Sequence, residues 1–390
     1  MRFNVWVVAA FAVLILTLPP QLGSWTHFDA ANGYHLESEY ESRRTSPSFS
    51  HLDAVQHPVV DPSVLGGAMV RDIDSIQNGD VLSCGWFYDE VSFGGTVYQS
   101  ELKSNGYPST DGFITIEHTT GLMDVFIING SGNLKVAECE GDGNGGVFFI
   151  FGADNFFGHL YLNGTPVYPV NGGWIGHMTA NGTVDLLIRG GGMDMIRSQN
   201  GIIIVGGFGG NISFGSWNLT ANTFQDVYVA ELGLNGTWNW AASAGGHYTT
   251  EVAFGVTEND DHVFVTGAYC MYSSSGECEI DFGAFSITSV GYDDIFVAAL
   301  NKSTIQWDWA RSAGSSGYDD GKAIELGDDG HLYLGGFYGG SISMGSTTLS
   351  HAGNIDAFIA SMDTNGTWRW ALGGGGVGVE NVEDRSIIHI

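Results

Sequence analysis

A phrase that begins with aspartate and ends in two tryptophans recurs three times in the second half of the chain. Its copies begin at Asp226, Asp293 and Asp356 and read DVYVAELGLNGTWNWA, DDIFVAALNKSTIQWDWA and DAFIASMDTNGTWRWA. A supersecondary unit that repeats at this spacing is typical of solenoids, propellers and arrays, in which each unit covers its neighbour. The repeat therefore constrains the architecture before any catalytic motif is considered.

Two shorter elements accompany the phrase. A turn, an apolar run and a glycine occur as NGDVLSCGWF, GGVFFIFGAD, NGIIIVGGF, DDHVFVTGAY and DDGHLYLGGF, beginning at Asn78, Gly145, Asn200, Asp260 and Asp328. A second run occurs as VSFG, ISFG, IDFG and ISMG, beginning at Val91, Ile212, Ile280 and Ile342. Each repeat thus offers four short strand-like runs separated by Gly, Asn or Asp turns.

The alternation within the phrase indicates how its strand is packed. Phe296 and Ala298 share one face, whereas Ile295 and Val297 share the other, because side chains alternate along a strand. Both faces are apolar, so the strand must be covered on both sides. Four strands in ~60 residues, repeated five times, favour a propeller over a solenoid. We therefore predict an all-β protein: a β-propeller with five recognisable four-stranded blades, either as a closed five-bladed ring or as a fragment of a larger ring.

Two details of this prediction concern the ends of the repeat. The second blade departs from the pattern, because Gly173 stands where the repeated aspartate is expected. After Trp370 the chain begins what resembles another opening strand. Pairing of residues 377–390 with the strand near Met69 would close a five-bladed ring and remove exposed edges.

Two kinds of residue in the phrase are candidates for function. Asp226, Asp294 and Asp356 start equivalent strands, where they could bind a ligand; capping of backbone N–H groups is the favoured interpretation. Alternation predicts that each tryptophan pair shares one face, which suits sugar stacking or, by preference, packing between blades. The pairs are Trp238 and Trp240, Trp307 and Trp309, and Trp368 and Trp370. Asn235-Gly236 and Asn365-Gly366 predict type I′ hairpin turns.

The phrase, with the turn, strand and glycine before it, resembles the β-propeller repeats of secreted prokaryotic surface proteins, a group often called SBBP-type repeats. The resemblance covers residues 66–390 and is weak in the second blade. It implies an extracellular propeller and offers no catalytic residues to transfer.

The N-terminus predicts export. Met1-Arg2 and the apolar run from Val5 to Leu18 have the charge, length and position of a secretory signal, and the run is short for a membrane span. We predict a signal peptide over residues 1–24, a linker or pro-segment over 25–65 and a repeat domain over 66–390. The mature protein is expected to be secreted or at the cell surface, with no membrane span.

Charge narrows the range of partners. The chain has 13 Lys and Arg against 43 Asp and Glu, which gives a formal net charge of −30. A field of this sign repels nucleic acid and anionic lipid, so neither is an expected partner. A surface component, either a glycan or a protein, is the expected partner.

Four cysteines suit an oxidising compartment. Cys270 and Cys278 flank a short loop and are predicted to form a disulfide; Cys84 and Cys139 could form a second. Zinc is disfavoured, because CxxC pairs and histidines at ligand spacing are missing. No cofactor is expected, although acidic turns such as Asp260-Asp261, Asp319-Asp320 and Asp328-Asp329 could supply oxygens for calcium.

No local motif for catalysis occurs. The sequence lacks G-x-S-x-G, HExxH and Walker patterns, and its G-x-G-x-x-G match at 141–146 precedes a strand-like run rather than a helix. A non-catalytic binding or structural module for glycans or surface proteins is therefore the leading hypothesis. Two alternatives stay open: a secreted glycan hydrolase or lyase, whose site could be assembled from several blades, and a quinoprotein-like domain.

Overall fold

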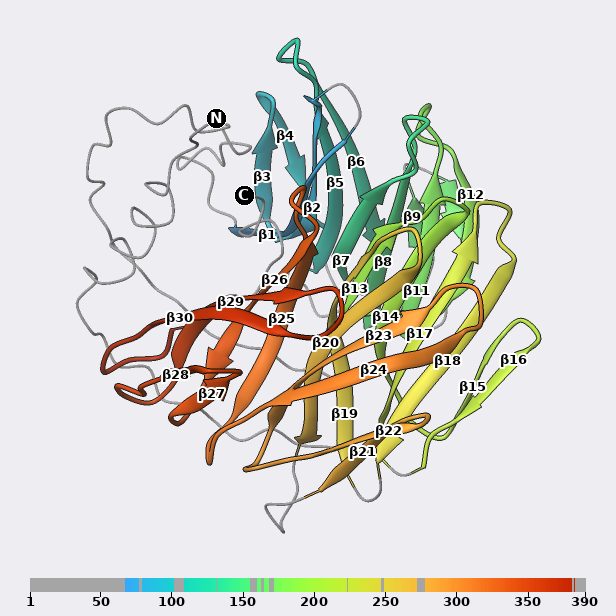
Figure 1. The fold of residues 1–390 in the computed structure, drawn as a ribbon. Helices are drawn as coiled ribbons and strands as arrows, with labels where there is room; N and C mark the ends of the chain where they lie inside the picture. Colours follow the sequence, from blue (N-terminus) through green and yellow to red (C-terminus); the bar gives the residue numbers. More distant parts are fainter. Residues whose placement is uncertain are drawn as a thin grey trace.

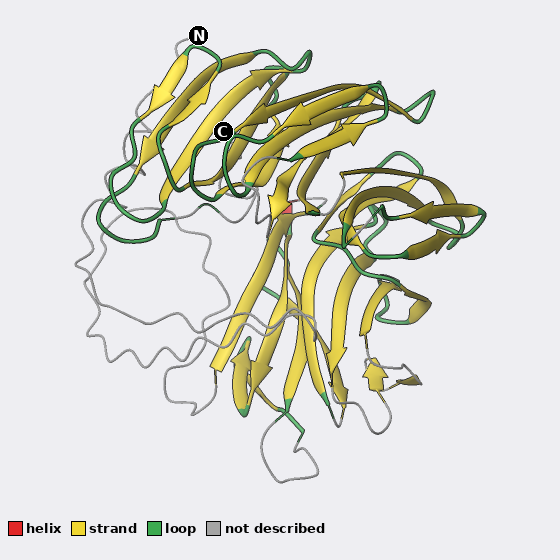
Figure 2. Ribbon diagram, turned by 90° about the horizontal axis from the view of Figure 1, so that it is seen from below, coloured by secondary structure: helices red, strands yellow, loops and turns green. Residues whose placement is uncertain are grey.

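The computed structural model describes residues 67–76, 79–101, 109–130, 132–154, 160–162, 165–167, 172–222, 224–246, 249–271, 278–380 and 382. They form strands β1 to β30, which Figure 2 shows joined by loops. The predicted all-β class is confirmed. The predicted signal peptide (1–24) and the predicted linker or pro-segment (25–65) lie outside the described residues.

Twenty of the strands form five antiparallel sheets with the same meander order, in which the first strand pairs with the second, the second with the third and the third with the fourth. The first sheet consists of β1 (Gly67–Ser75), β2 (Val81–Tyr88), β5 (Thr110–Glu117) and β6 (Met123–Gly130), and the second of β7 (Asn133–Gly141), β8 (Val147–Asp154), β11 (Gly172–Met178) and β12 (Val184–Arg189). The third consists of β13 (Asp194–Arg197), β14 (Gly201–Phe208), β17 (Asp226–Gly233) and β18 (Trp238–Gly246). The fourth consists of β19 (Thr250–Glu258), β20 (His262–Met271), β23 (Asp294–Asn301) and β24 (Gln306–Ala313), and the fifth of β25 (Asp319–Leu326), β26 (His331–Tyr338), β29 (Asp356–Asp363) and β30 (Trp368–Gly374).

The other ten strands form hairpins inserted between the second and third strands of each sheet. They are β3 (Glu90–Phe93) with β4 (Thr96–Gln99), β9 (Leu160–Leu162) with β10 (Thr165–Val167), β15 (Asn211–Phe214) with β16 (Trp217–Thr220), β21 (Glu279–Phe282) with β22 (Phe285–Thr288), and β27 (Ile342–Met344) with β28 (Thr347–Leu349). The VSFG-type runs therefore form these hairpins instead of sheet strands. Two hairpins also extend the preceding sheet, because β9 pairs with β6 and β21 with β18.

Figure 1 shows the sheets following one another in chain order around an arc, from blue at the top through green and yellow to red at the lower left. Consecutive first strands contact each other: β1 with β7, β7 with β13, β13 with β19, and β19 with β25. Apolar side chains fill the spaces between neighbouring sheets. Val229 of the third sheet and Phe296 of the fourth, for example, belong to one buried cluster, and Val297 of the fourth and Phe358 of the fifth belong to another.

Glycines in the second strands permit a close approach of the first strands. A Cβ atom on Gly267 would collide with the carbonyl oxygen of Val252, and one on Gly336 would collide with that of Asp320. Both glycines lie opposite β-bulges in the first strands. In the fourth and fifth sheets, the glycine that marks the repeat is therefore required by a bulged neighbouring strand.

The tryptophan pairs do not share one face, so this prediction is wrong. In β24, Trp307 lies opposite Leu300 and Trp309 opposite Ala299, which leaves Asp308 as an extra, bulged residue. A bulge interrupts the alternation of side chains and sends the two indoles to opposite faces. Equivalent bulges separate Trp238 from Trp240 and Trp368 from Trp370.

The two indoles of the fourth sheet therefore join it to both neighbours. The Trp307 Nε1–H donates to the carbonyl of Ser243 in the third sheet at 3.1 Å. The Trp309 Nε1–H donates to the carbonyl of Thr364 in the fifth sheet, also at 3.1 Å. Both rings are buried among apolar side chains of those sheets. Trp307 and Trp309 thus pack between neighbouring sheets, which is the role that the sequence favoured over sugar stacking.

The Asn-Gly turns also differ from the predicted type. Gly236 and Gly366 have φ of 77° and 84°, but Asn235 and Asn365 are not among the residues with positive φ. The Gly236 N–H donates to the Gly233 carbonyl, and the Gly233 N–H donates to the Thr237 carbonyl, at 2.9 Å each. This is a type I turn followed by a left-handed glycine, whereas a type I′ turn needs positive φ at both central residues. Because this loop ends in a glycine bulge, it is compatible with the bulged strand that follows.

The described end of the chain repeats a contact seen between earlier sheets. The N–H groups of Glu251 and Asp319, where β19 and β25 start, donate to the carbonyls of Gln225 and Asp293 at 3.0 and 2.8 Å. The Glu380 N–H donates in the same way to the carbonyl of Ile355 at 3.0 Å. Within the described residues, β1 pairs only with β2, and Val379 bridges Ile355. The predicted pairing near Met69 is not formed by residues 377–380, and residues 383–390 lie outside the described part.

Truncation of Trp309 tests the packing between the fourth and fifth sheets. We expect Trp309→Ala to lower the free energy of unfolding by about 3–5 kcal/mol, because it removes a buried indole and leaves a cavity. Trp217→Ala is the control, since Trp217 is 39% exposed on a hairpin; its cost should stay below about 1 kcal/mol. Urea unfolding followed by circular dichroism measures both, and equal losses would contradict this role of Trp309.

Candidate functional site

A buried aspartate marks the start of the third strand in four sheets. Asp111, Asp226, Asp294 and Asp356 are 0%, 2%, 0% and 1% exposed. Each carboxylate accepts a backbone N–H from the loop that leads into its strand. The donors are Glu101 to Asp111 and Asn222 to Asp226, each at 3.1 Å, Val290 to Asp294, and Ala352 to Asp356 at 2.7 Å.

A glycine completes this arrangement in the last three sheets. A Cβ atom on Gly245, Gly314 or Gly375 would collide with the carboxylate of Asp226, Asp294 or Asp356, respectively. Burial raises the pKa of Asp294 to about 7, and the N–H groups of Val290 and Gly291 act in the opposite direction. These contacts are the backbone caps favoured by the sequence, and they place the carboxylates inside the protein rather than in an open channel.

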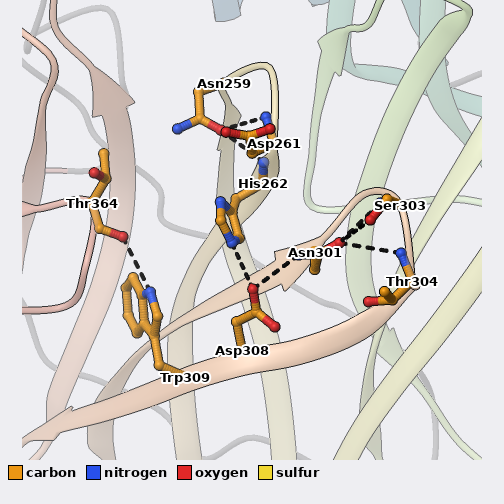
Figure 3. Close-up of polar contacts among 9 residues, drawn as sticks. All are labelled: Asn259, Asp261, His262, Asn301, Ser303, Thr304, Asp308, Trp309 and Thr364. Carbon is orange, nitrogen blue, oxygen red and sulfur yellow. Dashed lines mark hydrogen bonds and ion pairs between the residues drawn. The ribbon is translucent and has the colours of Figure 1, made fainter.

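At the opposite ends of the third strands, each sheet carries a cluster of polar side chains, which we call the turn-end clusters. Figure 3 shows the cluster of the fourth sheet, where His262 Nε2 lies 2.8 Å from Asp308 Oδ2. The Asn301 Nδ2–H donates to the same oxygen at 3.0 Å. Asn301 Oδ1 accepts the N–H groups of Ser303 and Thr304. Since Asp308 is the bulged residue between the two tryptophans, the bulge supplies the carboxylate of this cluster.

The other sheets carry related contacts at this end. In the fifth sheet, Asp363 contacts His331 and the bulged Arg369; in the third, Glu231 accepts hydrogen bonds from Ser198 Oγ and from the bulged Asn239 at 2.7 and 2.9 Å. In the first sheet, His118 lies between Asp80 and Asp124; in the second, His177 lies between Asp142 and Asp185. Recurrence in all five sheets indicates that these contacts fix the turns.

In two of the histidines, His118 and His177, both ring nitrogens contact a carboxylate. His118 Nδ1 lies 2.8 Å from Asp80, and its Nε2 lies 3.0 Å from Asp124. Both contacts are hydrogen bonds to ionised carboxylates only when both nitrogens carry a proton. The hydrogen bonds to Asp124 and Asp80 accordingly raise the pKa of His118, whereas the hydrogen bonds from Thr119 and His118 lower the pKa of Asp80. The protonated form of His118 is therefore the form that both carboxylates favour.

The third sheet carries a cavity at this end. Gly201 begins β14, where His262 begins β20 and His331 begins β26. A cavity of about 510 Å³ lies beside this position and is lined by Asn200, Glu231, Gly233, Leu234, Asn235 and Asn239. Glu231 is buried, whereas Leu234 is 51% exposed. The cavity thus combines three amides, one buried carboxylate and one aliphatic side chain.

The four cysteines form two pairs in space. Cys270 and Cys278 are joined by a disulfide, with their Cα atoms 5.9 Å apart, as predicted. Cys84 and Cys139 do not form a disulfide in the structure. Both are buried, and their thiols are hydrogen bonded to each other. The second suggested disulfide is therefore replaced by two neighbouring free thiols.

Carboxylates of two of the three predicted calcium turns make other contacts. Asp319 accepts the N–H of Ser315, Asp320 forms an ion pair with Lys322 at 2.8 Å, and Asp329 accepts the N–H of His331 at 3.1 Å. Among the described residues, one group of three His, Cys, Asp or Glu residues has ligand atoms within 4.8 Å of one another. That group consists of Asp72, Cys84 and Cys139, outside all the predicted calcium turns.

The turn-end clusters were not predicted from the sequence. His262 and His331 align at the starts of second strands, and both are partly buried against carboxylates. The one sequence feature that could have indicated these clusters is the polar residue between the two tryptophans of each W-x-W run. Strict alternation puts that residue on the face away from both tryptophans. A bulge at that residue instead places its side chain at the turn.

A scan against protein-family models finds no match for this chain, and a search of curated proteins finds none. In the described part of the chain, no helix has the length and apolar character that crossing a membrane requires.

The glycine beside Asp356 gives a matched test of the capped aspartates. Gly375→Ala should destabilise the protein by about 1–3 kcal/mol, because the new methyl group collides with the carboxylate. Gly374→Ala should change stability by less than about 1 kcal/mol, since its Cβ would meet nothing within 4 Å. Thermal unfolding compares them, and the same shift for both would contradict the close packing of Asp356.

The first turn-end cluster should depend on pH. The pKa of His118 is raised above 6.5. The contribution of His118 to stability is therefore complete below pH 6.5 and is lost as the pH rises through the folded-state pKa. The pKa of Asp80 is lowered from 3.8, so the contribution of Asp80 to stability is complete above pH 3.8 and is lost as the pH falls through the folded-state pKa. An NMR titration should show the His118 ring titrating above 6.5, and lower in Asp124→Asn. An unchanged value in that variant would exclude the predicted effect of the Asp124 carboxylate.

Proposed function

We propose that the protein is a secreted or cell-surface β-propeller that acts as a non-catalytic binding module for glycans. Three observations support the architecture: five sheets share one strand order, their first strands contact one another in sequence, and apolar clusters join neighbouring sheets. In this proposal each sheet is a blade. Glu380 contacts Ile355 as Glu251 and Asp319, which lie where β19 and β25 start, contact Gln225 and Asp293, so the segment at Glu380 is placed like the start of a further strand.

Two further features support the proposal that the protein is exported. Residues 1–18 have the pattern of a secretory signal, and Cys270–Cys278 is a disulfide, which persists in an oxidising compartment. The net charge of −30 suits a soluble surface protein and disfavours anionic ligands. A neutral glycan or a surface protein is compatible with this field.

The single observation that carries the glycan assignment is the cavity of the third sheet. Amide and carboxylate groups of Asn200, Asn239 and Glu231 line it, and the exposed Leu234 lies beside them. Amides and carboxylates hydrogen bond to sugar hydroxyls, while an aliphatic side chain packs on the apolar face of a sugar ring. Glu231 is held by Ser198 and Asn239, so its carboxylate is oriented before a ligand binds.

Calorimetry with a panel of neutral oligosaccharides tests this proposal. Leu234→Ala and Glu231→Gln should each weaken binding at least about tenfold, equivalent to about 1.4 kcal/mol. Asp308→Asn is the matched control, because it alters the turn-end cluster of the fourth sheet and not the cavity. Turnover of the oligosaccharides would favour the hydrolase or lyase alternative. Binding that both cavity variants leave unchanged would contradict the assignment.

A further inference from the structure

A buried aspartate and two buried cysteines meet where the first two sheets pack together. Asp72 belongs to β1, Cys84 to β2 and Cys139 to β7. They are 4%, 0% and 0% exposed, and one ligand atom of each lies within 4.8 Å of the others. The Cys139 N–H donates to Asp72 Oδ2 at 3.0 Å, which holds the carboxylate beside both sulfur atoms.

Another pair of sheets shows which part of this arrangement belongs to the common frame. Asp194 on β13 accepts the N–H of Val256 on β19 at 2.8 Å, a contact like that between Asp72 and Cys139. No thiol accompanies Asp194, because Val205 and Val256 occupy the positions that correspond to Cys84 and Cys139. An aspartate that bridges adjacent first strands is therefore structural, whereas the two thiols are an addition specific to the first two sheets.

The environment of the thiols is apolar. Both cysteines belong to a buried cluster with Leu82, Ile114 and Phe149. Burial, followed by the neighbouring Cys84 and Asp72, raises the pKa of the Cys139 thiol. Two thiolates and a carboxylate would repel one another here unless a cation were bound among them.

We propose that Asp72, Cys84 and Cys139 bind Zn²⁺ and thereby join the first sheet to the second. Thiolate ligands disfavour Ca²⁺ and Mg²⁺, whereas Zn²⁺ accepts both thiolate sulfur and carboxylate oxygen. Binding of one Zn²⁺ converts two thiols to thiolates and releases two protons, without any change of oxidation state. The aspartate, which comes from a different strand, supplies the ligand that sequence spacing did not reveal. This proposal is independent of the glycan site.

Metal content and cobalt absorption of the full chain test the proposal. Protein loaded with Zn²⁺ and dialysed should retain about one equivalent by mass spectrometry of metals. Co²⁺ in place of Zn²⁺ should give a thiolate-to-metal absorption band in the near ultraviolet. Cys84→Ser should abolish this band, and Asp72→Asn, which keeps an oxygen to accept the Cys139 N–H, should weaken metal affinity at least about tenfold.

Asp194→Asn is the matched control, since it alters the equivalent bridge between sheets without thiols nearby and should leave the metal content unchanged. If Cys84→Ser does not fold, the cobalt band of the wild type and the affinity of Asp72→Asn decide the question. A disulfide between Cys84 and Cys139 in the secreted protein, detected by peptide mass mapping, would overturn the proposal. Metal binding that survives loss of the thiols would overturn it as well.

Discussion

In four of the five sheets, a hydrogen bond from a loop N–H to a buried third-strand aspartate fixes the entry to the strand, and the regular arrangement of the last three sheets depends on it. A buried carboxyl group is costly unless it is hydrogen bonded, so the loop before the strand is confined to the path that supplies its donor. In the last three sheets the residue just before the aspartate, Gln225, Asp293 or Ile355, also accepts an N–H from the segment that begins the next unit. One short stretch thus fixes the entry to a strand and the position of the following sheet.

The W-x-W run links packing to the polar turn. Its bulge sends one indole toward the preceding sheet and the other toward the following sheet, as Trp307 and Trp309 show. The residue between them is then left at the turn, where Asp308 contacts His262. The same backbone irregularity therefore serves both the apolar interfaces and the turn-end clusters.

Strand positions were predictable because short apolar runs are bounded by turn residues throughout the repeat. The strand order was not predicted, because one of the four strand-like runs of the repeat, the VSFG-type run, forms the inserted hairpin instead of a sheet strand. The meander order that the structure shows holds in the divergent second sheet as well. The bulge at Asp308 was not predictable from alternation, since a period of two contains no information about an inserted residue. The turns at Asn235 and Asn365 were assigned to the wrong type for a related reason: the Asn-Gly dipeptide fits both a type I′ turn and a type I turn that ends in a glycine bulge.

Side-chain clusters formed by separate strands were the least predictable feature. Asp72, Cys84 and Cys139 come from three strands in two sheets, and their meeting depends on how those sheets pack. The cavity of the third sheet likewise brings together residues of separate segments, among them Asn200 and Glu231, and Glu231 replaces the smaller residues Ala299 and Ser361 of equivalent strands. Neither the cysteine–aspartate group nor the cavity can be predicted from residue spacing, because both are formed by residues that are distant in the sequence.

Amide hydrogen exchange at the loop donors tests the role of the buried carboxylates most directly. The N–H groups of Asn222, Val290 and Ala352 lie outside the strands, yet each is bonded to a buried aspartate. If these bonds hold the sheets in place, the three amides exchange as slowly as those in the middle of the adjoining third strands. Exchange at the rate of ordinary exposed loops would contradict the account.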